Sequence, residues 1–326
     1  MQKREVASIG VIIEREFQRY KRKEWGLVFA IAQICFYLYI LPEIGQRTWP
    51  IVLDLMKQYD LQKWQIAFIN TCFYNTFLYF FINFCFWIIY HIEHPFFEQY
   101  KIYDGQWPWK EDLNEWKELL RKSYTVVGIN NFIVIPIAQM IVTIKDDYQV
   151  RYSFEMEDLP DWKTILWQIL FSMWIQDFFF TASHWLLHKP FFYKKIHKLH
   201  HQYNQTIGFS AEYTHPFEFL FGNAIPFIIP AVILGQRMHY YTYIIWGTHR
   251  ILNTVILHSG YDFPWLPNDM CLFYSNAQYH DYHHSHNVGN FGGMFSIWDT
   301  LIGTNHTYYK YIDERINVKN KQQKAD

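Results

Sequence analysis

Cysteine is scarce in this 326-residue sequence, and the few that occur are far apart. The four are Cys35, Cys72, Cys85 and Cys271. No two of them have the short spacing of zinc ribbons or redox motifs. We therefore expect neither a disulfide framework nor a thiolate zinc site, and a metal site would have to be built from other side chains.

An excess of charge of either sign is also missing, because 29 Lys and Arg residues face 30 Asp and Glu residues. Nucleic-acid-binding proteins usually present a strongly basic face, so we expect no nucleic-acid partner. A secretory signal is missing as well, since residues 1–24 mix acids with bases and lack an apolar core before a cleavage site. We interpret residues 1–24 as a basic amphipathic segment on a membrane surface.

Several long stretches contain few or no charged residues. A bilayer core of about 30 Å needs about 20 apolar helical residues to span it, and these stretches are long enough. The mean hydropathy of −0.14 is low for a membrane protein. However, 21% of the residues are aromatic, and Tyr and Trp are typical of membrane interfaces. We predict an all-α, polytopic membrane bundle with about four spanning helices, at residues 25–41, 64–92, 123–144 and 164–187.

Two further apolar segments have features that disfavour contact with lipid. Residues 217–234 contain Pro226 and Pro230, and residues 238–258 contain Arg250. Proline interrupts the hydrogen bonds of a helix, and a charge at mid-membrane is costly. We therefore predict a re-entrant or interfacial hairpin that packs on the bundle.

The distribution of basic residues predicts an orientation, because cytoplasmic loops carry the excess of Lys and Arg. Residues 1–24, 91–122 and 188–216 contain seven, five and four of them. Residues 42–63 and 145–163 contain three each. We predict that both chain ends and all histidine-rich segments lie on the cytoplasmic side.

Histidine is abundant, and eight of the 16 histidines fall into three boxes: HWLLH (184–188), HKLHH (197–201) and HDYHH (280–284). Residues four apart share one face of a helix, so each box can point two ring nitrogens at one ion. The additional histidine of the second and third boxes would allow one helix to serve two ions. With His258, the boxes predict a dinuclear, histidine-rich cap with nine ligands: His184, His188, His197, His200, His201, His258, His280, His283 and His284. His215 is a candidate further ligand.

The all-imidazole ligand set favours iron. Structural zinc sites use four ligands and favour thiolate, and catalytic zinc sites need three protein ligands, whereas imidazole also suits iron. Two iron ions at a bilayer surface predict chemistry with dioxygen on a C–H bond of a lipid. The competing interpretation, unrelated core or surface histidines, is disfavoured by three boxes at helical spacing.

The order of HWLLH, HKLHH, SAEYTHPFE, HSGYDFPW, HDYHH and NFGGMFSIWDTLIGT resembles the fatty acid hydroxylase superfamily of membrane di-iron oxygenases. SAEYTHP and HSGYDFPW are most similar to its 4-methylsterol oxidase branch. The boxes alone fit sterol desaturases, sphingoid-base hydroxylases and fatty acyl hydroxylases equally well. The resemblance covers about residues 165–308, and the nine histidines match the ligand positions of the family.

The resemblance implies an activity and its partners. It implies oxidation of the 4-methyl groups of a sterol by dioxygen at two iron ions. The electrons would come from NAD(P)H through cytochrome b5. The expected location is the endoplasmic reticulum, with the mitochondrial inner membrane as the alternative. A second hypothesis is that the chain is a non-catalytic subunit of a larger membrane assembly, derived from this enzyme family.

Carboxylates near the boxes are candidates for fixing the ligand tautomers, because a ligating imidazole donates its second N–H to a carboxylate or carbonyl. Asp177 lies two turns before His184 inside an apolar span, where a charge without a role is costly. Asp281 lies within the third box, and Glu212 lies in SAEYTHP. For the last two, a helix cap or a surface charge is the competing interpretation.

Four lysines flank the second box and form what we call the lysine patch: Lys189, Lys194, Lys195 and Lys198. The lysine patch is a candidate docking site for an acidic cytochrome. A general excess of basic residues on the cytoplasmic side explains it equally simply.

The predicted organisation has four parts, which follow from the shifts in composition along the chain. They are an amphipathic segment (1–24), N-terminal transmembrane helices and loops (25–163), a catalytic region (164–308) and a polar C-terminal tail (309–326).

Overall fold

The computed structural model describes residues 24–266 and 273–322. Over these ranges the chain is helical, with three isolated β-bridges and no strand. The predicted all-α class is therefore confirmed. The predicted amphipathic segment, except its last residue, and residues 323–326 of the predicted tail lie outside the described ranges.

Three long helical segments make up most of the first half of the chain, and each contains a π-helical turn. The first comprises α2 (Glu24–Cys35), η1 (Phe36–Ile40) and α3 (Leu41–Gln58). The second comprises α4 (Lys63–Ile69), η2 (Asn70–Tyr74) and α5 (Asn75–Ile92). The third comprises α8 (Leu113–Ile129), η3 (Asn130–Val134) and α9 (Ile135–Lys145), which follow the short helices α6 (Pro95–Glu98) and α7 (Pro108–Glu111).

The second half begins with η4 (Met156–Asp158) and the long helix α10 (Trp162–Leu187), whose first turn is capped by Asp161. Short elements follow: α11 (Pro190–Lys195), η5 (His197–Gln202) and η6 (Gly208–Glu212). A helical hairpin comes next, with α12 (Pro216–Glu218), η7 (Phe219–Ala224), α13 (Ile225–Leu234), η8 (Gly235–Arg237) and α14 (Tyr240–Leu257). The chain ends with α15 (Ala277–His286), α16 (Ile297–Ile302) and α17 (His306–Gln322).

Within residues 24–266 and 273–322, five helical segments are long and apolar enough to cross a membrane: Val28–Gln58, Lys63–Ile92, Leu113–Lys145, Trp162–Leu187 and Pro216–Arg237. The first four correspond to the predicted spans. The fifth exceeds the predicted count of about four and lies in the segment that we assigned to a re-entrant or interfacial hairpin. Its helix continues from the π-helical turn η7 through Pro226 and Pro230, and α13 and α14 form a hairpin.

The first candidate span also extends beyond its predicted end at residue 41. The helix continues through Pro42 and Pro50 to Gln58, so most of the predicted loop at residues 42–63 is helical. Pro42 lies in the first turn of α3, where it is tolerated.

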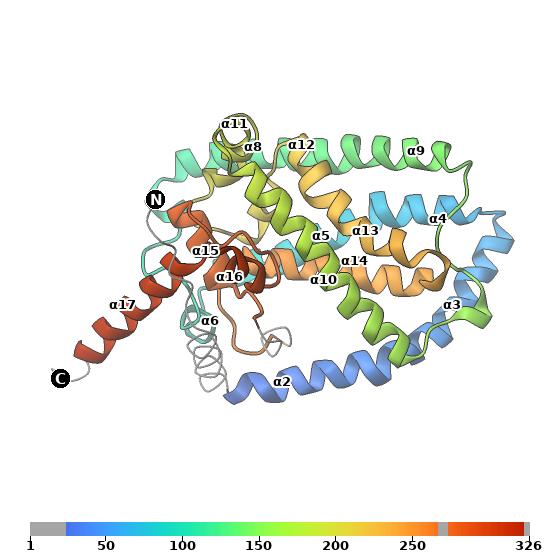
Figure 1. Cartoon of the computed structure of the whole chain (residues 1–326), viewed down its shortest axis with the longest axis horizontal. Coiled ribbons are helices and arrows are strands. Elements are labelled where there is room, and N and C mark those ends of the chain that lie inside the picture. The colour runs from blue at the N-terminus through green and yellow to red at the C-terminus, as the bar shows by residue number, and fades with distance from the viewer. Residues whose placement is uncertain (1–23, 267–272, 323–326) are drawn as a thin grey trace.

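Successive long segments run in alternating directions along the long axis of the molecule (Figure 1). The start of α2, the histidine-bearing helix α15 and α17 lie at the same end. The side of the membrane that this end faces remains a prediction.

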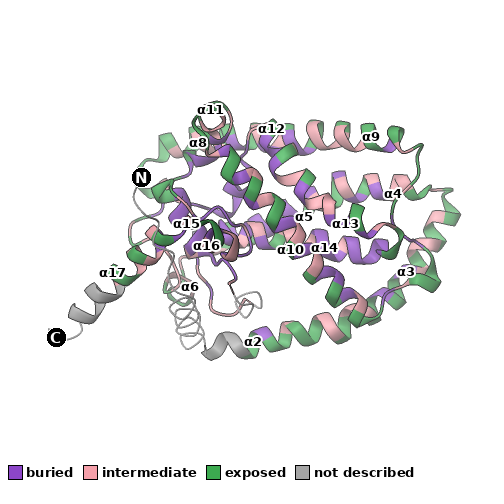
Figure 2. Cartoon of the chain, in the orientation of Figure 1, coloured by how far each residue is buried: buried purple, intermediate pink, exposed green. Residues whose placement is uncertain are grey.

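Helix α14 lies in the interior of the bundle, whereas α3 and α9 present exposed side chains (Figure 2). On α14, Trp246 and Val255 are fully buried. On α9, Ile137 and Ile141 are 56% and 60% exposed. Exposed apolar side chains on candidate spans are the surface expected to face lipid.

Candidate metal centre

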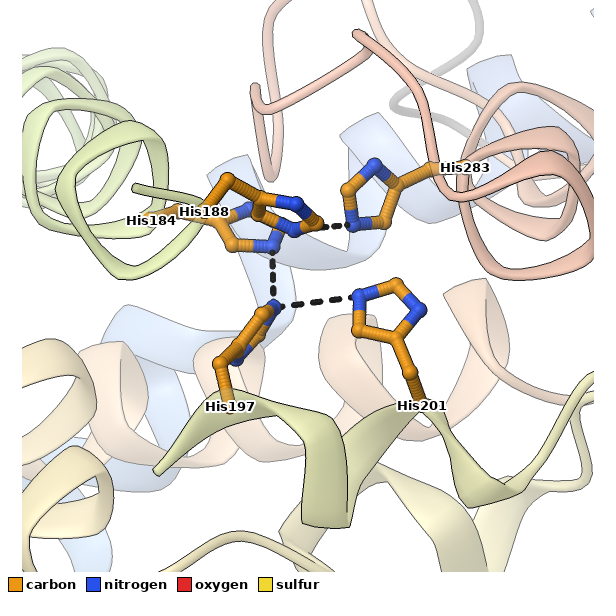
Figure 3. A group of neighbouring side chains, drawn as sticks. All are labelled: His184, His188, His197, His201 and His283. Carbon is orange, nitrogen blue, oxygen red and sulfur yellow. Dashed lines mark hydrogen bonds between the residues drawn. The ribbon is translucent and has the colours of Figure 1, made fainter. Parts of the chain in front are cut away.

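Five histidines converge at the end of α10, and we call them the five-histidine group: His184, His188, His197, His201 and His283 (Figure 3). One ring nitrogen of each lies within 4.8 Å of the corresponding nitrogen of every other member. The rings come from α10 and the residue that follows it, from η5 and from α15.

The hydrogen bonds of the five-histidine group fix which ring nitrogens carry protons. Nδ1 of His184 lies 2.8 Å from the carbonyl oxygen of Phe291, and Nδ1 of His283 lies 2.6 Å from that of Gly289. A carbonyl can only accept, so each Nδ1 is the protonated nitrogen and each Nε2 of the neutral ring is bare. Nδ1 of His197 likewise donates to Oε1 of Glu218 at 2.8 Å.

These bare nitrogens face one another. Nε2 of His197 lies 3.1 Å from Nε2 of His184 and 3.1 Å from Nε2 of His201. Nε2 of His188 lies 3.1 Å from Nε2 of His283. The Nε2 lone pairs of His184 and His197 repel at this distance, because the ring proton of each residue is already used at its Nδ1 atom. A cation between the rings would turn this repulsion into coordination.

The remaining four histidines form the four-histidine group: His200, His258, His280 and His284. Nδ1 of His258 donates to the carbonyl of Thr254 at 2.8 Å, and its Nε2 lies 2.9 Å from Nε2 of His280. Nδ1 of His284 donates to the carbonyl of Tyr203 at 3.1 Å. Nε2 of His284 is buried and makes no hydrogen bond within the described residues.

The spacing of the nitrogens fits metal coordination. For imidazole ligands at right angles, bonds of about 2.1 Å place neighbouring nitrogens about 3.0 Å apart. The closest observed separations are 2.9 and 3.1 Å. Burial also lowers the pKa of His197 to about 3 and that of His200 to about 4. Both rings are therefore neutral at physiological pH, as metal ligands must be.

The two groups are adjacent, and the second and third boxes are divided between them. His200 joins the four-histidine group while His197 and His201 join the other, and the ring centroids of His200 and His201 are 5.8 Å apart. The second box forms a 3₁₀-helix rather than the predicted α-helix. The third box is α-helical, and His283 separates from its neighbours in the same way.

The carboxylate that contacts a ligand is Glu218, which the sequence reasoning missed. Glu218 is buried at the start of a candidate span, and its Oε1 accepts from His197. Like Asp177, Glu218 is a lone acid in an apolar run, and this signal could have identified it from the sequence.

The three predicted carboxylates have other partners, and within the described residues none of them makes a hydrogen bond to a histidine. Asp281 accepts from the hydroxyl of Thr206, and Glu212 accepts from the amide of Asn131. Asp177 accepts from the backbone N–H groups of Met294 and Phe295. Seven residues along a helix span about 10.5 Å, so Asp177 shares a face with His184 without reaching it.

Asp177 and Asp299 instead hold the segment that supplies the carbonyl partners of His184 and His283. Asp299 accepts from the N–H groups of Phe291 and Gly292, at 2.9 and 2.7 Å. The segment follows these carboxylates so closely that a Cβ added at Gly293 would lie 2.9 Å from the ring of Phe180 and 3.1 Å from Oδ1 of Asp177. A Cβ added at Gly292 would lie less than 3.0 Å from the carbonyl oxygen of Phe295, so the close approach explains both glycines in NFGGMF.

His215 lies in neither histidine group. Its Nδ1 accepts from the N–H of Phe217 at 3.1 Å, so it caps the first turn of α12. The lysine patch is exposed beside the second box. Within it, Nζ of Lys189 lies 3.4 Å from the ring centroid of Trp185.

A small cavity of about 20 Å³ lies against both histidine groups, and its lining includes His184, His200, Ala211, Asn223 and Thr254. The last three also line a larger cavity of about 220 Å³ between α9, α13 and α14. The larger, mostly apolar cavity therefore lies next to the small cavity that contacts the histidines.

Comparison with known proteins gives a consistent relationship. The fatty acid hydroxylase family model matches residues 169–304. Methylsterol monooxygenase 1 of Rattus norvegicus is 30% identical over 282 residues, 84% of this chain and 87% of that protein. The Danio rerio protein of the same name is 29% identical over 86% of this chain and 90% of its own length. A very-long-chain aldehyde decarbonylase of Oryza sativa subsp. indica is 38% identical over 48% of this chain and 60% of its own length. No solved structure matches.

Proposed function

Because this chain belongs to the fatty acid hydroxylase family, we propose that it is a lipid-modifying membrane oxygenase that oxidises the 4-methyl group of a sterol. The proposal rests chiefly on one observation. Two adjacent groups of mostly buried imidazoles bring ring nitrogens to about 3 Å from one another, a spacing that fits two metal ions.

Similarity to the relatives favours a methylsterol over other lipids. The match to the rat methylsterol monooxygenase extends over 84% of the chain, including the N-terminal helices. The match to the rice aldehyde decarbonylase covers 48% of the chain. The shared region supports common metal chemistry, and the longer match supports the sterol substrate.

We infer that the nine histidines hold two iron ions, because an all-imidazole shell suits iron and contains no thiolate. When bound, the ions would supply the activation of dioxygen. The residues of the chain orient and shield this site. Glu218 and the carbonyls of Phe291, Gly289 and Thr254 hold the Nδ1 protons, so that each Nε2 faces inward.

The electrons would come from NAD(P)H through cytochrome b5, docked at the lysine patch beside the second box. The proposed location is the endoplasmic reticulum. In this organisation, residues 25–163 provide the membrane scaffold and residues 164–308 form the catalytic region, which includes both histidine groups.

The decisive experiment compares the sterols of cells that lack the gene with those of cells that carry only the His200→Ala variant. We expect 4-methylsterols to accumulate in both, because His200 belongs to the four-histidine group. The exposed His91 lies outside both groups, and His91→Ala should restore sterol oxidation. If His200→Ala also restores it, the chain is a non-catalytic subunit. If the deletion leaves the sterols unchanged, the sterol assignment is wrong.

A further inference from the structure

The larger cavity is lined by residues of candidate spans and shares Ala211, Asn223 and Thr254 with the small cavity beside the histidines. Val142 on α9 and Ile225 on α13 line it and are also 43% and 38% exposed on the outside of candidate spans. At the inner end its lining includes Thr254, whose carbonyl accepts from Nδ1 of His258. A lipid could therefore enter sideways and reach the centre with its apolar body in the cavity.

Arg250 is a charged residue, partly buried on α14, and its side chain lines the cavity. Within residues 24–266 and 273–322 its guanidinium makes no hydrogen bond and no ion pair, and its Cζ lies 5.6 Å from the ring centroid of Phe180. The carboxylates of Asp177 and Glu212 are near enough to counteract the lowering of the Arg250 pKa by burial, but neither comes within 4.0 Å.

An arginine without a hydrogen-bond acceptor is costly at this depth. Guanidinium carries five N–H donors, and a buried charge is tolerated in a membrane protein when it is paired or faces a functional cavity. Because the protein offers Arg250 no acceptor, the expected acceptor is a ligand in the cavity.

A carboxyl group faces the same space. Glu212 lines the cavity, and its Oε2 accepts from the amide of Asn131 at 2.7 Å. Within the described part of the chain, its Oε1 has no hydrogen-bond donor. Burial raises the pKa of Glu212 to about 7, against the opposing effects of Asn131 and Arg250. A donor and an acceptor therefore stand together in an otherwise mostly apolar cavity.

We propose that Arg250 and Glu212 anchor the hydroxyl group of a neutral lipid, and this inference rests on the proposed oxygenase function. The oxygen of an alcohol can accept from Arg250 while its proton is donated to Glu212. A lipid carboxylate could accept from Arg250, but it would lie against the carboxyl group of Glu212. An amine could donate to Glu212, but it would lie against the guanidinium of Arg250. Of the three headgroups, the alcohol satisfies both side chains.

The anchor would also fix which carbon is presented to the metal centre. Arg250, Thr254 and His258 follow one another at intervals of four residues on α14, so the anchor begins two turns, about 12 Å, before a ligand histidine. The Phe180 ring contacts both sides, because its centroid lies 5.6 Å from Cζ of Arg250 and 5.4 Å from the ring centroid of His184. Arg250 and Glu212 are thus positioning residues, which select substrates by the distance between the hydroxyl and the oxidised carbon.

The test measures binding to the metal-loaded protein without dioxygen or reductant, using three probes: a 4,4-dimethylsterol with a free 3-hydroxyl, its 3-deoxy analogue and its 3-hemisuccinate. We expect the alcohol to bind at least about tenfold more tightly than the deoxy compound, because hydrogen bonds to charged groups are the strong ones. Arg250→Met should abolish this preference, and Glu212→Gln should weaken it. The matched control Arg237→Met changes an exposed arginine outside the cavity and should preserve it.

Three outcomes would overturn the anchor: equal binding of alcohol and deoxy compound to the wild type, an unchanged preference in folded Arg250→Met, or tighter binding of the hemisuccinate. If Arg250→Met does not fold, the preference for the alcohol is measured in Arg250→Lys and Glu212→Gln instead. An unchanged preference in both variants, relative to the wild type, would then overturn the anchor. Binding is separate from turnover. A preference for the alcohol without sterol oxidation would refute the proposed function alone, whereas oxidation without the preference would refute the anchor alone.

Discussion

Replacing Glu218 by Gln should release the metal of the five-histidine group. Oε1 of Glu218 accepts from Nδ1 of His197 at 2.8 Å, and Oε2 is buried without a hydrogen bond in the described structure. A glutamine must either place its NH₂ group in that unpartnered position or turn it toward Nδ1 of His197. The first arrangement buries an unsatisfied donor, and the second removes the acceptor that keeps Nε2 bare.

The expected magnitude follows from the role of such partners. Loss of a group that orients a ligand typically lowers metal affinity about 10- to 100-fold, or about 1.4 to 2.8 kcal/mol. The four-histidine group has its own carbonyl partners and should keep its ion. The metal content of the Glu218→Gln protein should therefore fall from two ions per chain to one, at a chelator concentration at which the wild type keeps both.

The assay is metal content per chain along a chelator titration, by elemental analysis of protein from its native membrane. The matched control is Glu157→Gln, at an exposed glutamate in the loop between the third and fourth candidate spans. Retention of both metals by Glu218→Gln over the same range as the wild type would refute the role of Glu218. Zinc alone in the wild-type protein would refute the assignment of iron.

Two further predictions test the supporting segment and the docking surface. Gly293→Ala places a methyl group 2.9 Å from the ring of Phe180 and should destabilise the protein by about 1–3 kcal/mol in thermal unfolding. The control Gly128→Ala, with no atom within 4 Å of the new Cβ, should be neutral or stabilising in the same assay. Reversing the charges of the lysine patch should slow reduction by cytochrome b5 at least about tenfold at low salt. Reversing Lys57 and Lys145 should not, because they lie in the last turns of α3 and α9, which end at the opposite end of the bundle from α15 (Figure 1). An unchanged rate in the first variant would contradict docking there.

The sequence predicted the all-α class and four of the five candidate spans because each of these signals is local. Stretches without charge report membrane-spanning helices directly. The segment Pro216–Arg237 was not counted among the predicted spans, because we treated proline as a helix breaker. Its cost depends on the position within the helix, and the placement of Pro226 in the first turn, after a π-helical turn, cannot be predicted from spacing alone.

The supporting shell of the metal centre is harder to predict than the histidine boxes, because its contacts join distant parts of the chain. A box needs only helical periodicity, and a 3₁₀-helix still brings the second box to the centre. The partner of His197 lies 21 residues away, and that of His184 is a backbone carbonyl 107 residues away. A carbonyl leaves no signature in the side-chain sequence. The signal that remains is the NFGGMF segment, where two glycines permit the close approach that directs a carbonyl toward a ligand ring.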